Sequence, residues 1–554
     1  MRDFILKNKD WLLRETITVI ICLAVLLVNV FAGRLWYVAN DDFTFNFMTA
    51  GAYGDYGEYM IFINTIYGMF LKLLFKILPS VNWYLFIMLG LNLLSVNALC
   101  MCISRRLNIC KASVVSLIIN LILAKDFYEE VTFTHTALIL AIVGLCELVL
   151  CLYEFRRLRL AVGIVFVILA GLIRTDAYIM VLPVAGISVL YLIYKNKSVS
   201  KKMFIYAGII LVPILLGKVD EVIYQFNPYS RDTMKAINLY RDVFDHVNFD
   251  AEELEIAYQN GFSDAEITLL QNYIIGDTDK FEYGRLKKLR DALYATGRYS
   301  IRISRSVLST VCFYIYNRSL EDIRVIAALW IFVLLYAQVC GKKEATILWA
   351  GMSAYLIGMY YFFVCWNRVM WKVELGIWLA IIALFTCVME LKSTDTSRVS
   401  GIISIIIGIF AMFVYTYNIP FEEIDINAIN SSEFFDTIHG RNDNYTYVTG
   451  VYALDSYENM NILTITGAYK DYFDKICLVG GWDSKMPAML AKYEEKGIKN
   501  PIAELSYRDD LLYAGNDDEA DLLVRYLGEV YEEDVGYTVV ETIGDVTIYK
   551  FNKN

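Results

Sequence analysis

The sequence predicts an α-helical polytopic membrane protein of about 11 transmembrane helices with a small α/β domain at its C-terminal end. Of the 554 residues, 57% are hydrophobic, whereas an ordinary soluble domain is roughly 45–50% apolar. The mean hydropathy is +0.46, and long apolar runs recur up to residue 417. Residues 418–554 lack such runs and contain 26 acidic against 11 basic residues. We therefore expect a transmembrane domain over 1–417 and a separate acidic domain over 418–554.

The expected spans are the apolar runs that approach the ~20 residues needed to cross a membrane. They cover 16–35, 82–103, 112–124, 137–153, 160–173, 177–194, 203–217, 324–341, 345–365, 371–390 and 401–417. A further apolar stretch, 59–78, contains Asn64, Lys72 and Lys76. With 11 spans and a cytoplasmic N-terminus every inner loop is positive, whereas a twelfth span would turn most of these loops outward. We therefore expect 59–78 to be an interfacial helix.

This topology places the polar bulk of the chain on the outer side of the membrane. A loop of about 105 residues, 218–323, contains Ser263 and Glu266 at the spacing of a helix-capping box. In the tail, alternating patterns predict strands at 445–454, 461–466 and 537–551 and helices at 487–496 and 517–527. The result would be a small extracytoplasmic α/β domain.

Composition also excludes several kinds of site. An acidic soluble part is a poor nucleic-acid binder, because phosphate binding needs clustered Lys and Arg. The 11 Cys form no Cys-X-X-Cys pair and the three His lie far apart, so no zinc site or disulfide framework is indicated.

The sharpest candidates for chemistry are Asp41 and Asp42, directly after the first span. Ionisable residues at a membrane edge are costly to bury and mark functional sites, and a carboxylate here is placed to act as a general base on a hydroxyl. The alternative is a solvated helix cap. The second outer turn holds Asp126, Glu129, Glu130 and His135. It suits hydroxyl orientation or a divalent ion, but is also typical of a solvated turn.

Cations at three further outer positions are candidate phosphate ligands. Arg174 and Asp176 interrupt an apolar stretch, where Arg174 would clamp a phosphate or else snorkel or pair with Asp176. Arg368 and Lys372 lie between Trp366 and Trp371, a pattern that fits a lipid phosphate or an ordinary aromatic belt. In the long loop, Arg231, Arg241, Asp242 and His246 would face the site or form salt bridges.

This arrangement resembles the GT-C superfamily of integral membrane glycosyltransferases. Asn40-Asp41-Asp42-Phe43 matches the acidic position after the first span of that superfamily. The stretch Tyr59–Leu78 looks like its juxtamembrane helix, and Arg174–Tyr178 is similar to an Arg-containing outer turn in several members. The chain also looks like uncharacterised bacterial membrane proteins of surface-polysaccharide loci. It has no Trp-Trp-Asp signature of oligosaccharyltransferases and no clear metal-binding set, although a divalent cation remains possible.

The resemblance implies a multi-pass protein of the cytoplasmic membrane that takes a sugar from a polyprenyl-phosphate donor. The acceptor would be a cell-envelope glycan, lipid or protein, with Asp41 or Asp42 as base in an inverting transfer. Arg174, and with it Arg368 or Lys372, would stabilise the departing phosphate, and Asp176, Glu130 and His135 would complete the substrate site. The turn Gly480-Gly481-Trp482-Asp483 is a sugar-stacking turn or a tight structural turn with a core Trp.

Three other functions remain open. A polysaccharide polymerase or ligase would depend on loop cations such as Arg231 and Arg241 rather than on the Asp pair. A transporter would be expected to show inverted repeats and broken helices, which the sequence does not display. A non-catalytic scaffold for surface-glycan assembly would use the acidic pair only as a cap.

Overall fold

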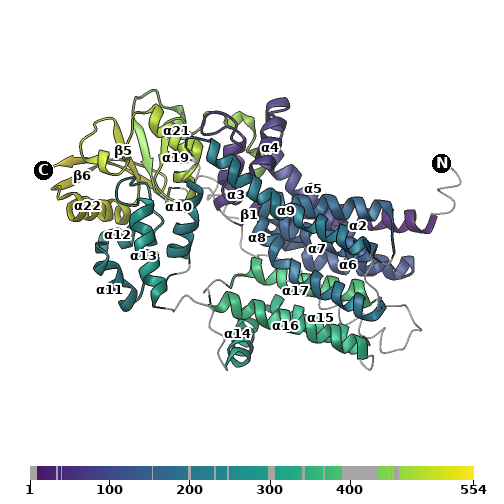
Figure 1. The fold of residues 1–554 in the computed structure, drawn as a ribbon. Helices are drawn as coiled ribbons and strands as arrows, with labels where there is room; N and C mark the ends of the chain where they lie inside the picture. The colour runs from purple at the N-terminus through teal and green to yellow at the C-terminus, as the bar shows by residue number, and fades with distance from the viewer. Residues whose placement is uncertain are drawn as a thin grey trace.

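A helical body and a C-terminal α/β unit make up the computed structural model (Figure 1). It describes residues 9–32, 35–38, 40–105, 107–152, 154–196, 201–229, 233–245, 247, 249–296, 306–339, 343–365, 369–389, 433–450, 452–453 and 461–554. The predicted span 401–417 and the predicted domain boundary near 417 lie outside these ranges. The expected fold class, a polytopic helical protein with a small C-terminal α/β part, is confirmed.

Long apolar helices form the body. They are α2 (Lys9–Phe31), α5 (Trp83–Ser104), α6 (Ile109–Ala124), α7 (Phe133–Cys151), α8 (Arg157–Asn196), α9 (Lys201–Phe226), α15 (Ile323–Val339), α16 (Lys343–Cys365) and α17 (Trp371–Met389). Within the described residues, six segments are long and apolar enough to cross a membrane, which makes this a multi-pass membrane protein. Every residue of α7 is buried, because this helix lies at the centre against α5, α8 and α17.

Helix α8 contains both predicted spans 160–173 and 177–194, separated by a break. Arg174 has the non-helical angles φ −156° and ψ 100°. Gly171, before the break, packs against Pro213 of α9, whereas Tyr178, after it, donates to the carbonyl of Ile210 at 2.8 Å. Both sides of the break thus contact α9, and the break lies at the boundary between the two predicted spans.

Short elements gather at one end of the body. They are β1 (Trp36–Tyr37), α3 (Asn40–Thr49), α4 (Thr65–Ile77), the π-helix η1 (Lys125–Glu129), β2 (Glu130–Val131), α10 (Thr233–Tyr240), the π-helix η2 (Arg241–Asp245), α11 (Ala251–Gln259), α12 (Asp264–Gln271), α13 (Tyr283–Ala295) and α14 (Val307–Glu321). The predicted capping box is present, with the side chains of Ser263 and Glu266 each accepting from the backbone of the other. The start of α2 lies at the opposite end (Figure 1).

Helix α4 is shorter than the predicted interfacial helix 59–78. It begins after Asn64, whose side chain caps it by accepting from Ile66 N. The prediction of helix from residue 59 was wrong, because Phe62 takes a left-handed conformation with φ 72°. One face of α4 packs on the body, while Met69, Phe70, Leu73 and Ile77 leave an apolar face exposed. That exposed face suits a helix lying in the membrane interface.

The C-terminal unit is a five-stranded sheet in the order β4-β3-β5-β7-β6. Its strands are β3 (Thr446–Thr449), β4 (Ile476–Leu478), β5 (Leu511–Gly515), β6 (Val535–Ile543) and β7 (Val546–Lys553), and its helices are α19 (Glu433–Gly440), α21 (Pro487–Glu495) and α22 (Asp517–Tyr531). Strands β3, β4 and β5 are parallel, whereas β6 and β7 form an antiparallel hairpin.

Both predicted tail helices are confirmed, but two strand predictions were wrong. The segment 461–466 forms a 3₁₀ turn at Ile462–Thr464 instead of a strand, because the side chain of Asn461 caps a helical turn by accepting from Leu463 N. The predicted strand 537–551 is two strands, since Gly544 reverses the chain with φ 58°.

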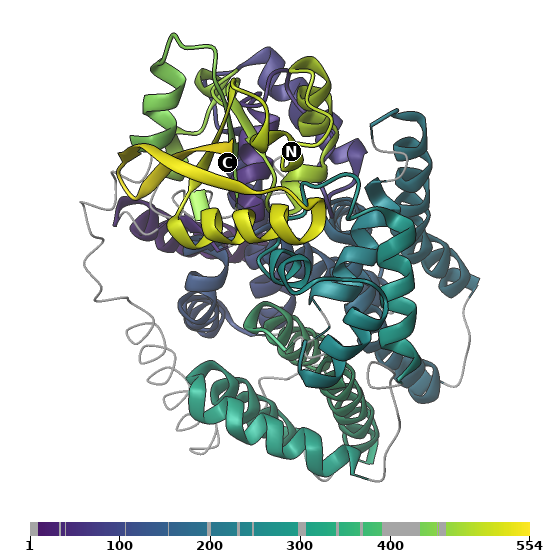
Figure 2. The same cartoon turned by 90° about the vertical axis from the view of Figure 1, so that its left-hand side faces the viewer.

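The C-terminal unit is docked on the end of the body where the short elements gather (Figure 2). Backbone hydrogen bonds join the two parts, from Phe473 N to Ala52 O at 2.7 Å and from Gly467 N to Pro79 O at 2.7 Å. The ring of Phe47 in α3 packs against Tyr472 and Phe473. Residues far apart in sequence therefore meet at this interface.

Candidate functional site

Helix α3 presents its two acids to different surroundings. Consecutive helical residues point about 100° apart, so Asp41 and Asp42 cannot share one environment. Asp42 is fully buried in the body, where its Oδ1 accepts from the Tyr84 hydroxyl at 2.7 Å and from Phe133 N at 3.0 Å. Asp41 is only partly buried, and its charge acts on Asp483 of the C-terminal unit. The pair is thus divided between the body and the interface.

The buried carboxyl of Asp42 is electrostatically perturbed. Burial raises its pKa from 3.8 to about 7, although the hydrogen bonds from Tyr84 and Phe133 act in the opposite direction. The second oxygen, Oδ2, is enclosed and has no hydrogen-bond partner within the described part of the chain. Asp42 therefore fixes the start of α3 to α5 and α7 while it titrates near neutral pH.

Arg174 lies beside the segment that binds Asp42. Its Nη1 donates to Thr134 Oγ1 at 2.6 Å, and its guanidinium lies over the rings of Phe133 (4.9 Å) and Phe62 (5.4 Å). The break in α8 places this cation at the boundary between the two halves of the helix. Asp176 points elsewhere, because its side chain is 67% exposed and pairs with Arg241 of η2 at 3.4 Å.

The second outer turn forms a separate polar cluster next to α3. Strand β2 pairs with β1, with Glu130 opposite Trp36, and so joins this turn to the chain just before Asp41. His135 Nδ1 donates to the carbonyl of Asp126 at 2.8 Å, since a carbonyl only accepts. Its Nε2 is buried and unpartnered among the described residues. Burial and the charge of Asp126 raise the pKa of Glu130, which pairs with Lys125, to about 7.

Arg324 is a member of this cluster that sequence analysis missed. It pairs with Asp322 at 2.8 Å and with Asp126 at 3.4 Å, and its guanidinium stacks over Trp371 at 4.1 Å. The Trp371 indole donates to Asp126 Oδ1 at 2.6 Å, and the charge of Lys372 reaches His135. The Asp322-X-Arg324 pair at the start of an apolar run was the available sequence signal.

The C-terminal unit contributes a turn to the same interface. Gly481, with φ 69°, redirects the chain after β4 into the 3₁₀ turn Trp482–Lys485. The Trp482 ring makes edge contacts with Phe62 (6.1 Å), Tyr240 (6.5 Å) and Tyr273 (6.2 Å). Ligands in α/β folds bind beyond the carboxyl ends of parallel strands, which is where this turn follows β4.

Two side chains of this turn have unusual electrostatics. Asp483 is buried, and burial together with the charge of Asp41 raises its pKa well above 3.8, although Thr44 of α3 hydrogen-bonds to it. Lys485 lies 6.0 Å from the Tyr240 ring, and burial lowers its pKa to about 8. Sequence analysis noted this turn but could not connect it to α3, because Thr44 lies 439 residues before Asp483 in the chain.

Three candidates from sequence analysis, Arg231, His246 and Arg368, lie outside the described residues. Of the others, Asp41, Asp42 and Arg174 gather around α3 and the start of α7, whereas Glu130, His135 and Lys372 belong to the adjacent cluster of η1 and α17. Within the ranges that the structure describes, no three His, Cys, Asp or Glu side chains converge closely enough to hold a metal ion.

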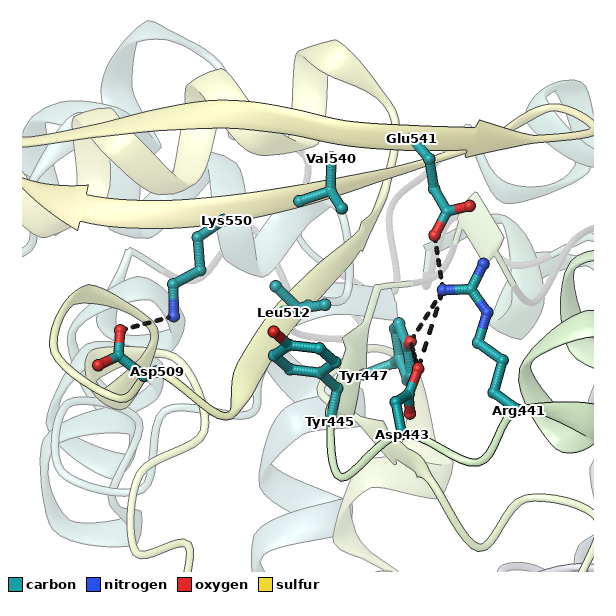
Figure 3. A pocket seen from close by; sticks show the side chains of 9 residues that line it. All are labelled: Arg441, Asp443, Tyr445, Tyr447, Asp509, Leu512, Val540, Glu541 and Lys550. Atoms are coloured by element: carbon teal, nitrogen blue, oxygen red, sulfur yellow. Dashed lines mark hydrogen bonds and ion pairs between the residues drawn. The ribbon is translucent and has the colours of Figure 1, made fainter.

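A pocket of about 480 Å³ lies elsewhere, at the amino ends of β3 and β5 (Figure 3). Its charged groups bind one another: Arg441 contacts Glu541 and the Tyr447 hydroxyl, and Lys550 pairs with Asp509 at 3.2 Å. Because these charges are internally paired, the pocket offers a weaker case for substrate binding than the interface around α3.

The chain is similar to a solved structure, "Crystal Structure of ArnT from Cupriavidus metallidurans in the apo state", with a TM-score of 0.40 and 12% identity. The alignment covers 96% of this chain and 97% of that one. No protein-family model and no curated protein matches the sequence.

Proposed function

We propose that the protein is a membrane glycosyltransferase of the GT-C type. It moves a sugar from a polyprenyl-phosphate donor to a hydroxyl of a cell-envelope glycan, lipid or protein on the outer face of the cytoplasmic membrane. The observation that carries the proposal is the division of the acid pair on α3, with Arg174 beside it at the end of a membrane body. An acid, a cation and the aromatic rings of Phe62 and Phe133 lie close together here, and such groups suit the binding of a phosphorylated sugar.

In the proposed reaction Asp41 is the general base. Its carboxylate takes the proton of the acceptor hydroxyl as the hydroxyl oxygen attacks the anomeric carbon, and the bond from that carbon to the phosphate oxygen breaks. Polyprenyl phosphate leaves, and Arg174 stabilises its charge together with Lys372 and Arg368. Inversion at the anomeric carbon follows from a single displacement.

Asp42 is a positioning residue in this proposal. Its contacts with Tyr84 and Phe133 hold the first turn of α3 against the body, and Asp41 is its chain neighbour. Glu130 and His135 line the adjacent cluster and orient donor hydroxyls. A general base must reach the proton it removes, and of the two acids only Asp41 is partly exposed at the interface.

The test compares Asp41→Asn, Asp42→Asn and Arg174→Gln with a matched control, Asp509→Asn, whose side chain is fully exposed beside Lys550. A deletion strain is complemented with each variant, and membrane abundance and surface glycans are measured. Purified protein is then assayed for release of polyprenyl phosphate, with and without a chelator to test for a divalent cation. We expect Asp41→Asn to lose at least 100-fold in rate, since a general base contributes about 10²–10⁴-fold.

Other outcomes would favour the other functions. Loss of activity in Arg241→Gln with full activity in Asp41→Asn would indicate a polymerase or ligase that depends on loop cations. An unchanged glycan profile in the Asp41→Asn/Asp42→Asn double variant, in a strain where deletion alters the profile, would refute the proposed base and favour a transporter or scaffold.

A further inference from the structure

The pocket of about 480 Å³ on the C-terminal unit is lined by residues of β3, β5, β6 and β7 and of the segments that precede β3 and β5 (Figure 3). Its volume falls in the range of about 300–1,000 Å³ that is typical of ligand sites in proteins. None of the residues that line it belongs to the interface around α3. The pocket is therefore a separate feature of the surface, and its lining decides which class of ligand fits it.

A β-bulge in β6 directs two consecutive side chains to the pocket. Consecutive residues of a regular strand point to opposite faces of the sheet, yet Val540 and Glu541 both line the pocket. Val540 has no partner in the ladder with β7, whereas the residues on both sides of it are paired. It is thus the extra residue of a bulge, a feature that often redirects a side chain next to a functional site. The bulge adds an exposed apolar group to a charged wall.

The charged groups at one end of the pocket neutralise one another. Arg441 contacts Glu541 at 2.5 Å and donates to the Tyr447 hydroxyl at 3.1 Å. Tyr447 in turn donates to Asp443 Oδ2 at 2.8 Å, and Lys475 pairs with Asp443 Oδ1 at 2.8 Å. Two cations and two carboxylates thus balance. Because no counter-charge is left over, this end fits an uncharged polar ligand better than a phosphate or a carboxylate.

The middle of the pocket is apolar and aromatic. The Tyr445 ring, 43% exposed, and the bulged Val540, 50% exposed, line it together with Leu512 (Figure 3). At the far end Lys550 pairs with Asp509, whose side chain is fully exposed to solvent. A sugar has an apolar face formed by its C–H groups and a rim of hydroxyls, each of which both donates and accepts. The exposed ring and the paired charges match these two features.

We infer that this pocket binds a neutral carbohydrate, with Tyr445 and Val540 contacting the apolar face of one sugar ring. Glu541 accepts from the sugar hydroxyls and Arg441 donates to them, while the two side chains stay paired. Because Arg441 is already held by Glu541 and Tyr447, little side-chain entropy is lost on binding. The inference rests on the proposed function and adds that the acceptor is a glycan, which the C-terminal unit holds apart from the site of transfer.

The test measures glycan binding by the full-length protein in nanodiscs with isothermal titration calorimetry. The probe is the lipid-free polysaccharide that mild acid releases from the envelope of the deletion strain, which carries unmodified acceptor. The variants are Tyr445→Ala, Tyr445→Phe and Glu541→Gln, at positions that are 43% and 38% exposed, so the core of the unit is untouched. Asp509→Asn is the matched control, because it changes a fully exposed carboxylate at the far end of the pocket, outside the proposed contacts.

We expect Tyr445→Ala to raise the midpoint of the titration about tenfold, which corresponds to about 1.4 kcal/mol. Glu541→Gln should raise it about threefold or more, because a neutral amide accepts a weaker hydrogen bond than a carboxylate. Tyr445→Phe and Asp509→Asn should bind like wild type, since the ring and the paired cluster remain. In the transfer assay we expect Tyr445→Ala to raise KM for the glycan and to change kcat little.

Two treatments of the wild-type titration test the class of ligand. An excess of inorganic phosphate should not compete, because the charges of the site are balanced. Periodate, which cleaves the vicinal diols of sugars, should abolish binding of the polysaccharide. Competition by phosphate would show an anion site, and binding that survives periodate would show that a peptide or lipid component is the ligand; either result would overturn the inference.

Wild type that does not bind the polysaccharide would also overturn it, as would equal midpoints in wild type, Tyr445→Ala and Glu541→Gln. A loss in Asp509→Asn or Tyr445→Phe as large as that in Tyr445→Ala would likewise refute the assigned contacts. The proposed function is tested separately by Asp41→Asn. Release of polyprenyl phosphate equal to wild type in that variant would refute the proposed function and leave the pocket result intact. Loss of release in Asp41→Asn, with unaltered midpoints in the pocket variants, would overturn only the pocket assignment.

Discussion

At the scale of single residues, the acid pair on α3 has two members with different roles. Asp42 is enclosed and anchored by Tyr84 and Phe133, whereas Asp41 lies at the interface with the C-terminal unit. Neighbouring carboxylates on a helix diverge, so Asp42 is fully enclosed whereas Asp41 stays partly exposed.

Asp42 predicts a specific pH dependence of stability. Its pKa is higher in the folded protein, about 7, than in an unfolded chain, where it is near 4. The raised pKa therefore leaves the free energy of unfolding unchanged below pH 4, lowers it progressively between pH 4 and 7, and lowers it by the full amount above pH 7. We expect Asp42→Asn to raise Tm by about 2 °C or more at pH 8 and to change it little at pH 5.

The measurement is thermal unfolding of purified variants at pH 5, 6, 7 and 8. Asp509→Asn, which removes a fully exposed carboxylate, is the control. Its Tm should differ from that of wild type by the same amount at every pH. A Tm difference between wild type and Asp42→Asn that is constant from pH 5 to pH 8 would contradict a raised pKa at Asp42.

At the scale of elements, helix α4 is fixed against the first outer loop by a close backbone approach. A Cβ added at Gly68 would lie 2.0 Å from the carbonyl oxygen of Glu58, and a backbone atom cannot swing away as a side chain can. Lys72, one turn further on, pairs with Glu58. The position of α4, and with it the loop that carries Tyr53, depends on the absence of a side chain at residue 68.

We expect Gly68→Ala to destabilise the protein by about 1–3 kcal/mol, the usual cost of forcing extra atoms into a packed site, and to reduce glycosyl transfer. The matched control is Gly90→Ala in α5, where an added Cβ meets nothing within 4 Å. That change should be neutral or slightly stabilising, because Ala favours a helix over Gly. Equal Tm values for the two variants would refute the close approach of α4.

At the scale of the whole molecule, a buried carboxylate links the long outer loop to the C-terminal unit. Asp277 accepts from the hydroxyls of Tyr526 at 2.7 Å and Tyr531 at 2.6 Å, and from Asn500 Nδ2 at 3.0 Å. Its own loop supplies further donors, Asp279 N and Lys280 N. Both oxygens of this carboxylate thus accept hydrogen bonds, as expected for a structural link.

Removing this link should loosen the C-terminal unit. Asp277→Ala leaves the hydroxyls of Tyr526 and Tyr531 without an acceptor, each at a cost of about 1–3 kcal/mol, whereas Asn500 still donates to Asp279 and Tyr531. We expect faster hydrogen exchange in α22 and around Asn500. Asp291→Asn, which removes a more than half-exposed partner of Arg290 in the same loop, is the control. Unchanged exchange in α22 would show that Asp277 does not hold the two parts together.

The sequence by itself determined the helical membrane body, the acidic α/β tail and the interruption at Arg174. These features follow from local patterns, because a membrane span is recognised by a run of about 20 apolar residues and a helix by its apolar periodicity and capping residues. Short buried strands such as β4 and β5 were not predicted, because three to five apolar residues have no distinctive periodicity.

Only the tertiary structure decided which of these residues meet. Asp42 contacts Phe133, 91 residues away, and Arg324 contacts Asp126, 198 residues away. Asp483 interacts with Thr44, 439 residues away. Such contacts depend on how helices and the sheet pack against one another, and on the desolvation that this packing imposes on each charge. No pattern within a local window of the sequence contains that information, because burial and pKa are properties of the assembled fold.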